Sequence, residues 1–179
     1  MKKRSLDIYK VVSVALFVAL LSVTSFIVIP IPFSFVPITL QTIVINIIAI
    51  RFKTKEAMII IFLYMLLGIL GVPVFGGSAG IGKLLSPAGG YYIGFILSVF
   101  VMSMFKKNNL CFKNILMILL FVGMPIQHGC AVGLMLFYNN FDIVNAFLTI
   151  SVPFILGDII KCIISSFILT KLTNIIKQN

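Results

Sequence analysis

Long apolar runs, separated by short polar or glycine- and proline-rich segments, dominate the chain. Most of these runs approach the ~20 residues that a helix needs to cross ~30 Å of hydrocarbon. The pattern predicts six transmembrane helices, at residues 11–29, 36–50, 57–72, 90–105, 114–138 and 146–170. The second and third runs are short, so we expect those helices to be tilted, shielded by neighbours or continued by the loops beside them.

Composition places the whole chain in the membrane class. Of its 179 residues, 61% are hydrophobic and only 10% are charged, whereas a soluble domain has roughly 25% charged residues. We therefore expect an all-α integral membrane protein, with residues 1–179 forming a single membrane domain. Six spans use about 120 residues, which leaves no room for an extramembrane catalytic domain of ~100–150 residues. A nucleotide-hydrolysing domain within this chain is excluded.

The basic residues alternate between the two sides of the predicted helices. Twelve of the fourteen Lys and Arg residues fall before the first helix, between helices two and three, between four and five, or after six: Lys2, Lys3, Arg4, Lys10, Arg51, Lys53, Lys55, Lys106, Lys107, Lys113, Lys171 and Lys177. The positive-inside rule then places both termini in the cytoplasm. The net charge of +10 is thus a signal of membrane orientation, and no nucleic acid partner is expected.

Two charged residues lie well inside the sixth predicted helix. Asp158 and Lys161 are three positions apart and so share one helix face, where they can pair. A charge at the bilayer centre costs at least ~2.5–3.5 kcal/mol, so such residues normally face a cavity or a partner. The pair offers an acceptor beside a donor, which suits a small polar ligand with N–H and C=O groups, such as a cyclic urea or amide. The alternative is a structural ion pair that holds two helices together.

Residues 71–90 form a segment with seven glycines, two prolines and Lys83, the one lysine predicted on the outer side. Glycine lets backbone approach a ligand closely, and a loop of this length is often a lid or a binding loop. Ser78, Gly80, Lys83, Gly90 and Tyr91 are the candidate ligand contacts of this region. The alternative is an ordinary flexible connection. Residues 77–83 also fit GxxxxGK, but Leu84 replaces the required Ser or Thr, so we expect no nucleotide site.

Other polar or small residues have two interpretations each. Gln41, near the same outer mouth, either binds ligand or bridges helices. Ala15 and Ala19 form a small-xxx-small pair that allows close helix packing. His128 has no ligand-type neighbour at metal spacing, so core packing is favoured over a metal site or a proton relay. The sequence contains no nucleophile–base pair or carboxylate cluster, so we expect no enzyme, no metal and no cofactor.

Four separated segments resemble the BioY family, the biotin-specific substrate-capture (S) components of energy-coupling-factor (ECF) transporters. They are VPITLQT at 36–42, LGILGVPVF at 67–75, SPAGGY at 86–91 and PFILGDIIK at 153–161. The third departs from the family, which commonly has Gly-Pro-Thr-Gly-Gly where this chain has residues 86–90.

The resemblance implies six helices, an outward-facing biotin pocket and a lid-like loop after the third helix. It implies that Asp158 and Lys161 contact the ureido ring of biotin, and Gln41 matches the family's helix-two glutamine. Ala15 and Ala19 match the motif that packs against the transmembrane coupling subunit. Energy would come from separate ATPase subunits that use ATP, in a bacterial cytoplasmic membrane. The alternatives are an S component for another vitamin, or a membrane scaffold protein with a structural Asp–Lys pair.

Overall fold

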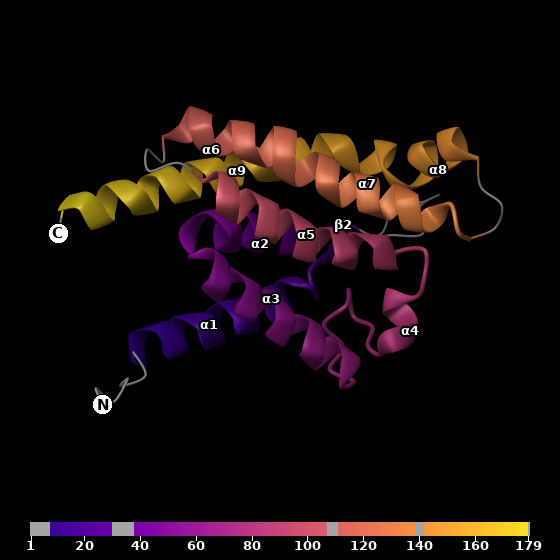
Figure 1. Ribbon diagram of the computed structural model, residues 1–179, viewed down its shortest axis with the longest axis horizontal. Helices are drawn as coiled ribbons and strands as arrows, with labels where there is room; N and C mark the ends of the chain where they lie inside the picture. Colours follow the sequence, from indigo (N-terminus) through magenta and orange to yellow (C-terminus); the bar gives the residue numbers. More distant parts are fainter. Residues whose placement is uncertain (1–7, 30–37, 107–110, 139–141, 179) are drawn as a thin grey trace.

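The computed structural model describes residues 8–29, 38–106, 111–138 and 142–178, and these form a bundle of helices (Figure 1). The helices are α1 (Ile8–Thr24), α2 (Gln41–Arg51), α3 (Thr54–Ile69), α4 (Ile81–Leu84), α5 (Gly89–Phe105), α6 (Phe112–Ile118), the π-helical turn η1 (Leu119–Gly123), α7 (Met124–Met135), α8 (Ile143–Ile150) and α9 (Val152–Gln178). Two short antiparallel strands, β1 (Val28–Ile29) and β2 (Ile38–Thr39), pair Val28 with Thr39.

The helices are arranged around a central pair, α2 and α5. Figure 1 shows α6, α7 and α9 on one side of this pair and α1 and α3 on the other. Both ends of the chain lie at one end of the molecule, whereas α4 and the glycine-rich segment lie at the opposite end (Figure 1). This arrangement brings residues from α2, the glycine-rich segment, α5 and α9 around one space.

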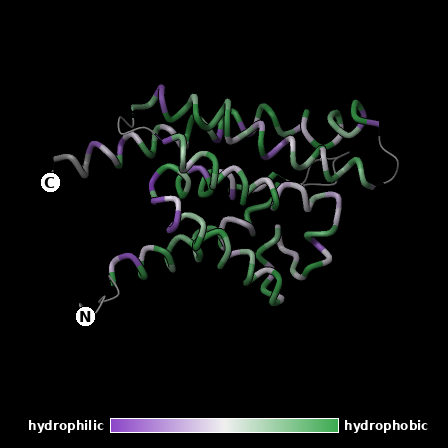
Figure 2. Tube along the Cα trace, in the orientation of Figure 1, coloured by the Kyte–Doolittle hydropathy of each residue, from purple (hydrophilic) through white to green (hydrophobic). Residues whose placement is uncertain are grey.

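Hydrophobic residues predominate along the helices (Figure 2), and many large apolar side chains are exposed on the outside of the bundle. Large side chains such as Leu16, Phe121 and Leu156 are more than 60% exposed, which a protein in water would avoid but lipid accommodates. Within the described ranges, two helices are long and apolar enough to cross a bilayer on their own, Phe112–Met135 and Val152–Asn174. At 11 residues, α2 would span only ~16 Å, and nine of its side chains are buried by neighbours.

The helix boundaries differ from those predicted in ways that have local causes. The expected sixth helix, 146–170, is interrupted at Ser151, where α8 ends and α9 begins. Pro153, in the first turn of α9, has no N–H to donate and therefore suits a helix start rather than a helix interior.

The other expected helices shift at their ends. The expected helix 11–29 ends at Thr24, and α2 begins at Gln41, after strand β2, instead of at 36. Residues 36 and 37 lie outside the described residues, as do Lys2, Lys3, Arg4 and Lys107. The expected helix 57–72 occupies 54–69, and 114–138 occupies 112–135 with a π-helical turn. The fourth, 90–105, is extended by one residue, Gly89.

Two glycines allow α5 and α7 to pack closely. A Cβ added at Gly90 would lie 2.5 Å from the carbonyl oxygen of Cys130, and one at Gly94 would lie 2.8 Å from the Cα of Gln127. These distances are shorter than normal contacts, so any larger residue would push the two helices apart. Close packing here fixes the position of α7 relative to the first turn of α5, which carries Tyr91 and Tyr92.

Lys106, which follows α5, connects the C-terminal ends of α5 and α2. Its Nζ donates a hydrogen bond to the carbonyl oxygen of Phe52, the residue that caps the C-terminus of α2. A cation at this position complements the free carbonyls of a helix end. Partial burial lowers the pKa of the Lys106 ammonium group.

Candidate functional site

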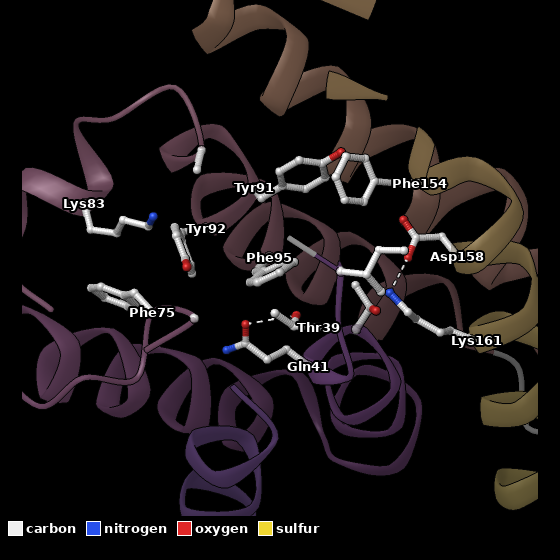
Figure 3. A pocket seen from close by; sticks show the side chains of 14 residues that line it. Thr39, Gln41, Phe75, Lys83, Tyr91, Tyr92, Phe95, Phe154, Asp158 and Lys161 are labelled. Atoms are coloured by element: carbon white, nitrogen blue, oxygen red, sulfur yellow. Dashed lines mark hydrogen bonds and ion pairs between the residues drawn. The ribbon is translucent and has the colours of Figure 1, made fainter. Parts of the chain in front are cut away.

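A pocket lies among α2, α5, α9 and the glycine-rich segment (Figure 3). Its free volume is about 50 Å³. Apolar and aromatic side chains form most of the wall, and a few polar ones converge on it, as is typical of small-molecule sites. The lining residues are Ile38, Thr39, Gln41, Thr42, Phe75, Gly76, Lys83, Ala88, Tyr91, Tyr92, Phe95, Phe154, Asp158 and Lys161.

Asp158 and Lys161 form an ion pair in the wall of this pocket. The Nζ of Lys161 donates to Oδ1 of Asp158 at 2.9 Å, and each residue is only 7% exposed. The i, i+3 spacing on α9 brings the two charges together, as the sequence predicted. Because each charge neutralises the other, the pair can remain ionised in an apolar interior.

The same carboxylate has a second partner, on another helix. The Nε2 of His128, from α7, lies 3.1 Å from Oδ2 of Asp158, so both carboxylate oxygens are held by basic side chains. The sequence pattern around His128 favours core packing and does not predict this contact with a pocket residue. One signal is present in the sequence. Burying a titratable side chain in an apolar run is costly, so His128 needs a polar partner elsewhere in the fold.

Tyr91, in the first turn of α5, lies next to His128 and lines the pocket. Its hydroxyl donates to the carbonyl oxygen of Ile150 at 2.5 Å and lies 3.4 Å from Nδ1 of His128. Ile150 is the last residue of α8, so this hydrogen bond satisfies a carbonyl at the interruption between α8 and α9. Tyr91 therefore bonds to the residue before the break and also lines the pocket.

The glycine-rich segment is anchored over the pocket by Phe75. This side chain is fully buried, and its ring makes edge contacts with Tyr64 and a tilted contact with Tyr92. The chain then reverses at Gly76 and Gly77, whose φ angles of 62° and 79° lie in the left-handed region that glycine adopts without strain. Backbone hydrogen bonds between Phe75 and Ser78 close the turn in both directions.

Gln41 lines the pocket and also bridges the surrounding elements. Its Nε2 donates to the hydroxyl of Tyr64 and, at 3.4 Å, to the carbonyl oxygen of Val74, while its Oε1 accepts from Thr39. The Tyr64 hydroxyl in turn donates to the Val74 carbonyl oxygen at 2.7 Å. Both interpretations of Gln41 are therefore compatible with its position, because it joins α2 to α3 and to the glycine-rich segment.

Lys83 is the cation at the other side of the pocket. It belongs to the short helix α4, and Figure 3 shows its side chain reaching toward Tyr92, across the pocket from Asp158 and Lys161. Three other expected contacts, Ser78, Gly80 and Gly90, are not among the lining residues. Gly90 packs on α7 instead, and the Gly80 N–H donates to the carbonyl oxygen of Gly68 at 2.8 Å.

Thr42 is a lining residue that the sequence analysis did not select. It is 9% exposed, and its Oγ1 has no hydrogen-bond partner among the described residues. A buried hydroxyl without a partner costs about 1–3 kcal/mol, so this atom is available to a bound molecule. The signal in the sequence was its position directly after Gln41, in the first turn of a helix.

Ala15 and Ala19 lie away from the pocket. Both are exposed on one face of α1, so the small-xxx-small pair is open to another helix. Among the described residues, no group of three or more His, Cys, Asp or Glu side chains could hold a metal ion.

Comparison with known proteins gives one consistent family. The BioY family profile matches residues 1–178. The biotin transporter BioY of Thermotoga maritima is 32% identical over 91% of this chain and 95% of its own length. The biotin transporter BioY2 of Lactococcus lactis is 41% identical, over 50% of this chain and 49% of its own length. A crystal structure of the S-component for biotin from an ECF-type ABC transporter superimposes with a TM-score of 0.86, at 25% identity, over 97% of this chain and 95% of that one.

Proposed function

The chain belongs to the BioY family, and from this membership we propose that it binds biotin in the pocket formed by α2, α5, α9 and the glycine-rich segment. It functions in biotin uptake as an S component and is a transport protein, not an enzyme. The observation that carries the site assignment is the buried ion pair of Asp158 and Lys161 in the pocket wall.

The ion pair matches the ureido ring of biotin, which has N–H donors beside a carbonyl acceptor. Asp158 accepts from a ureido N–H through its free lone pairs, and Lys161 donates to the ureido oxygen with one of its remaining protons. Both are charge-assisted hydrogen bonds in a site with little water, where such bonds are strong. Gln41, whose polar atoms already have partners, supports the wall from α2.

The rest of biotin fits the remainder of the wall. Its thioether ring and valeryl chain are apolar, and Tyr92, Phe95 and Phe154 supply apolar surface between the ion pair and Lys83. Its carboxylate is an anion, and Lys83 is the cation at the opposite side of the pocket. Ser78 and Gly80 are second candidates for this end only if the glycine-rich segment rearranges, because their N–H groups donate to the carbonyl oxygens of Phe75 and Gly68.

Biotin enters only if the glycine-rich segment, residues 71–90, moves away from the pocket. The free volume of about 50 Å³ is well below the ~300 Å³ at which small-molecule sites begin. Phe75 and Lys83 belong to the segment over the pocket, and its anchoring contacts are side-chain packing and a few hydrogen bonds. We propose that this segment opens outward to admit biotin and closes over it.

The membrane arrangement that supports uptake has six spans in a single membrane domain, with both termini in the cytoplasm and the pocket facing outward, in a bacterial cytoplasmic membrane. In its support, the two chain ends lie at one end of the molecule and the glycine-rich segment at the other. The sixth span is α9, which is long enough to cross a bilayer on its own, and α8 leads into it. A coupling subunit packs on the open α1 face at Ala15 and Ala19, and cytoplasmic ATPase subunits supply the energy.

The site assignment is tested by calorimetry of biotin with the purified protein in detergent. Asp158→Asn and Lys161→Ala each remove a charge-assisted hydrogen bond, so affinity should fall about 10- to 100-fold. Asp142→Asn and Lys171→Ala are matched controls outside the pocket and should bind normally. Unchanged binding in both pocket variants would overturn the assignment. Competition by thiamine, riboflavin or lipoate would indicate another vitamin, and no saturable ligand would indicate a scaffold.

A further inference from the structure

His128 contacts the ion pair from outside the pocket lining. It is 7% exposed, and its Nε2 approaches Oδ2 of Asp158 at 3.1 Å, while Lys161 holds Oδ1 at 2.9 Å. The Asp158 carboxylate is thus fixed from two helices, α7 and α9. Without His128, the plane of the carboxylate would be set by Lys161 alone.

The hydrogen bonds around His128 show where its protons lie. An ionised carboxylate only accepts, so Nε2 carries a proton and donates it to Asp158. The single hydroxyl proton of Tyr91 is directed to the Ile150 carbonyl oxygen at 2.5 Å, so Tyr91 offers Nδ1 an oxygen acceptor at 3.4 Å and no donor. A neutral imidazole leaves Nδ1 without a donor, whereas a second proton on Nδ1 would point at the Tyr91 oxygen.

An oxygen atom thus faces each ring nitrogen of His128: Oδ2 of Asp158 at Nε2 and the Tyr91 hydroxyl at Nδ1. The titratable groups facing it are Tyr91 from α5 and Asp158 from α9, with Lys161 beyond Asp158. From α8, the residues at this level are apolar: Ile143, Val144, Phe147 and Leu148. His128 also borders the groove between α7 and α8, which lies outside the ligand pocket.

We propose that His128 is a positioning residue that orients Asp158 for the ureido ring and makes biotin affinity depend on pH. This inference rests on the proposed function. When His128 is neutral, only Lys161 offsets the negative charge of Asp158, and the carboxylate is a strong acceptor for a ureido N–H. When His128 is protonated, two cations share that charge, the carboxylate accepts less strongly, and affinity falls.

The test measures biotin affinity by calorimetry between about pH 6 and pH 8, the range in which histidines commonly change charge. For the unaltered chain we expect about 5-fold weaker binding at the acid end. His128→Gln keeps an Nε2 donor that does not titrate, so its affinity should exceed that of His128→Phe and should not change with pH. His128→Phe keeps the ring but removes the donor, so binding should be about 5- to 10-fold weaker at every pH.

The controls separate this inference from the proposed function. Biotinamide lacks the carboxylate and should show the same pH dependence, because the effect arises at the ureido end. A pH dependence that persists in His128→Gln, or normal affinity in His128→Phe, would overturn the role of His128 alone. Failure of the unaltered chain to bind biotin, or normal binding by Asp158→Asn, would instead count against the proposed function.

Discussion

The ring of Phe75 packs directly on the backbone of Gly68, in the last turn of α3, so that a Cβ at position 68 would overlap the ring. This contact joins the glycine-rich segment to α3, the helix that precedes it. Gly68 is therefore required by a close approach of a side chain, and it links the stability of α3 to the closure of the pocket.

Gly68→Ala should displace Phe75 and destabilise the protein. Forcing an extra carbon into a packed interior costs about 1–3 kcal/mol, so we expect a lower unfolding temperature in detergent and weaker biotin binding. Gly133→Ala is the matched control, because nothing lies within 4 Å of a Cβ at this helical position. An unchanged unfolding temperature for Gly68→Ala would contradict the packing seen here.

Thr42→Val tests whether the unpartnered hydroxyl meets the ligand. Valine has nearly the same shape, so removing Oγ1 should leave the fold intact or stabilise it slightly, since the buried hydroxyl has no partner among the described residues. Biotin affinity should fall about 3- to 10-fold if the hydroxyl bonds to the ligand. Thr42→Ser keeps the hydroxyl and should bind normally. Equal affinity for the Val and Ser variants would remove Thr42 from the site.

Gly90→Ala distinguishes packing from ligand contact at a residue expected to bind substrate. A Cβ here would press on the Cys130 carbonyl oxygen at 2.5 Å, so the variant should unfold at a lower temperature by the cost of overpacking, about 1–3 kcal/mol. Thermal unfolding with and without biotin measures this. A variant of normal stability that no longer binds biotin would instead support a direct contact between Gly90 and the ligand.

Lys83→Ala should weaken biotin binding by about 3- to 10-fold, the value of a partly exposed charge-assisted contact. The loss should be confined to ligands with a carboxylate, so biotinamide should bind the variant and the unaltered chain equally. Calorimetry with both ligands gives the comparison. If both ligands lose affinity to the same degree, Lys83 affects binding through the position of the glycine-rich segment and not through a contact with the carboxylate.

Ala15→Leu and Ala19→Leu should separate binding from transport. Both positions are exposed and distant from the pocket, so purified protein should bind biotin normally. A bulky side chain on a small-xxx-small face prevents close helix packing, so biotin uptake by cells carrying the coupling and ATPase subunits should fall severely. Normal uptake would show that this face is not the contact surface, and Leu16→Ala offers a size-changing control on the same helix.

The sequence predicted those features that depend on local spacing. The Asp158–Lys161 pair follows from an i, i+3 separation on one helix, and it is present at 2.9 Å. His128 was missed because its partner is 30 residues away on a different helix, and no spacing rule connects them. Gly90 was assigned to the ligand from a loop motif, but only the packing of α5 on α7 shows what its missing Cβ accommodates.

Helix ends show the same limit. The interruption at Ser151 had a signal in Pro153, yet the apolar run continues through it without a break in hydropathy. The carbonyl of Ile150 at this break is satisfied by Tyr91, a residue far away in the sequence. A helix interruption of this kind can be located only when the residue that hydrogen-bonds to the freed backbone carbonyl is known.

The small free volume of the pocket, about 50 Å³, bears on the time course of capture under the proposed function. If the glycine-rich segment opens to admit biotin, the observed association rate should level off at high biotin concentration, at the rate of opening. The same closure slows departure, because a bound molecule must wait for the next opening. A slow exit at low external biotin holds each captured molecule long enough for the transport step to follow.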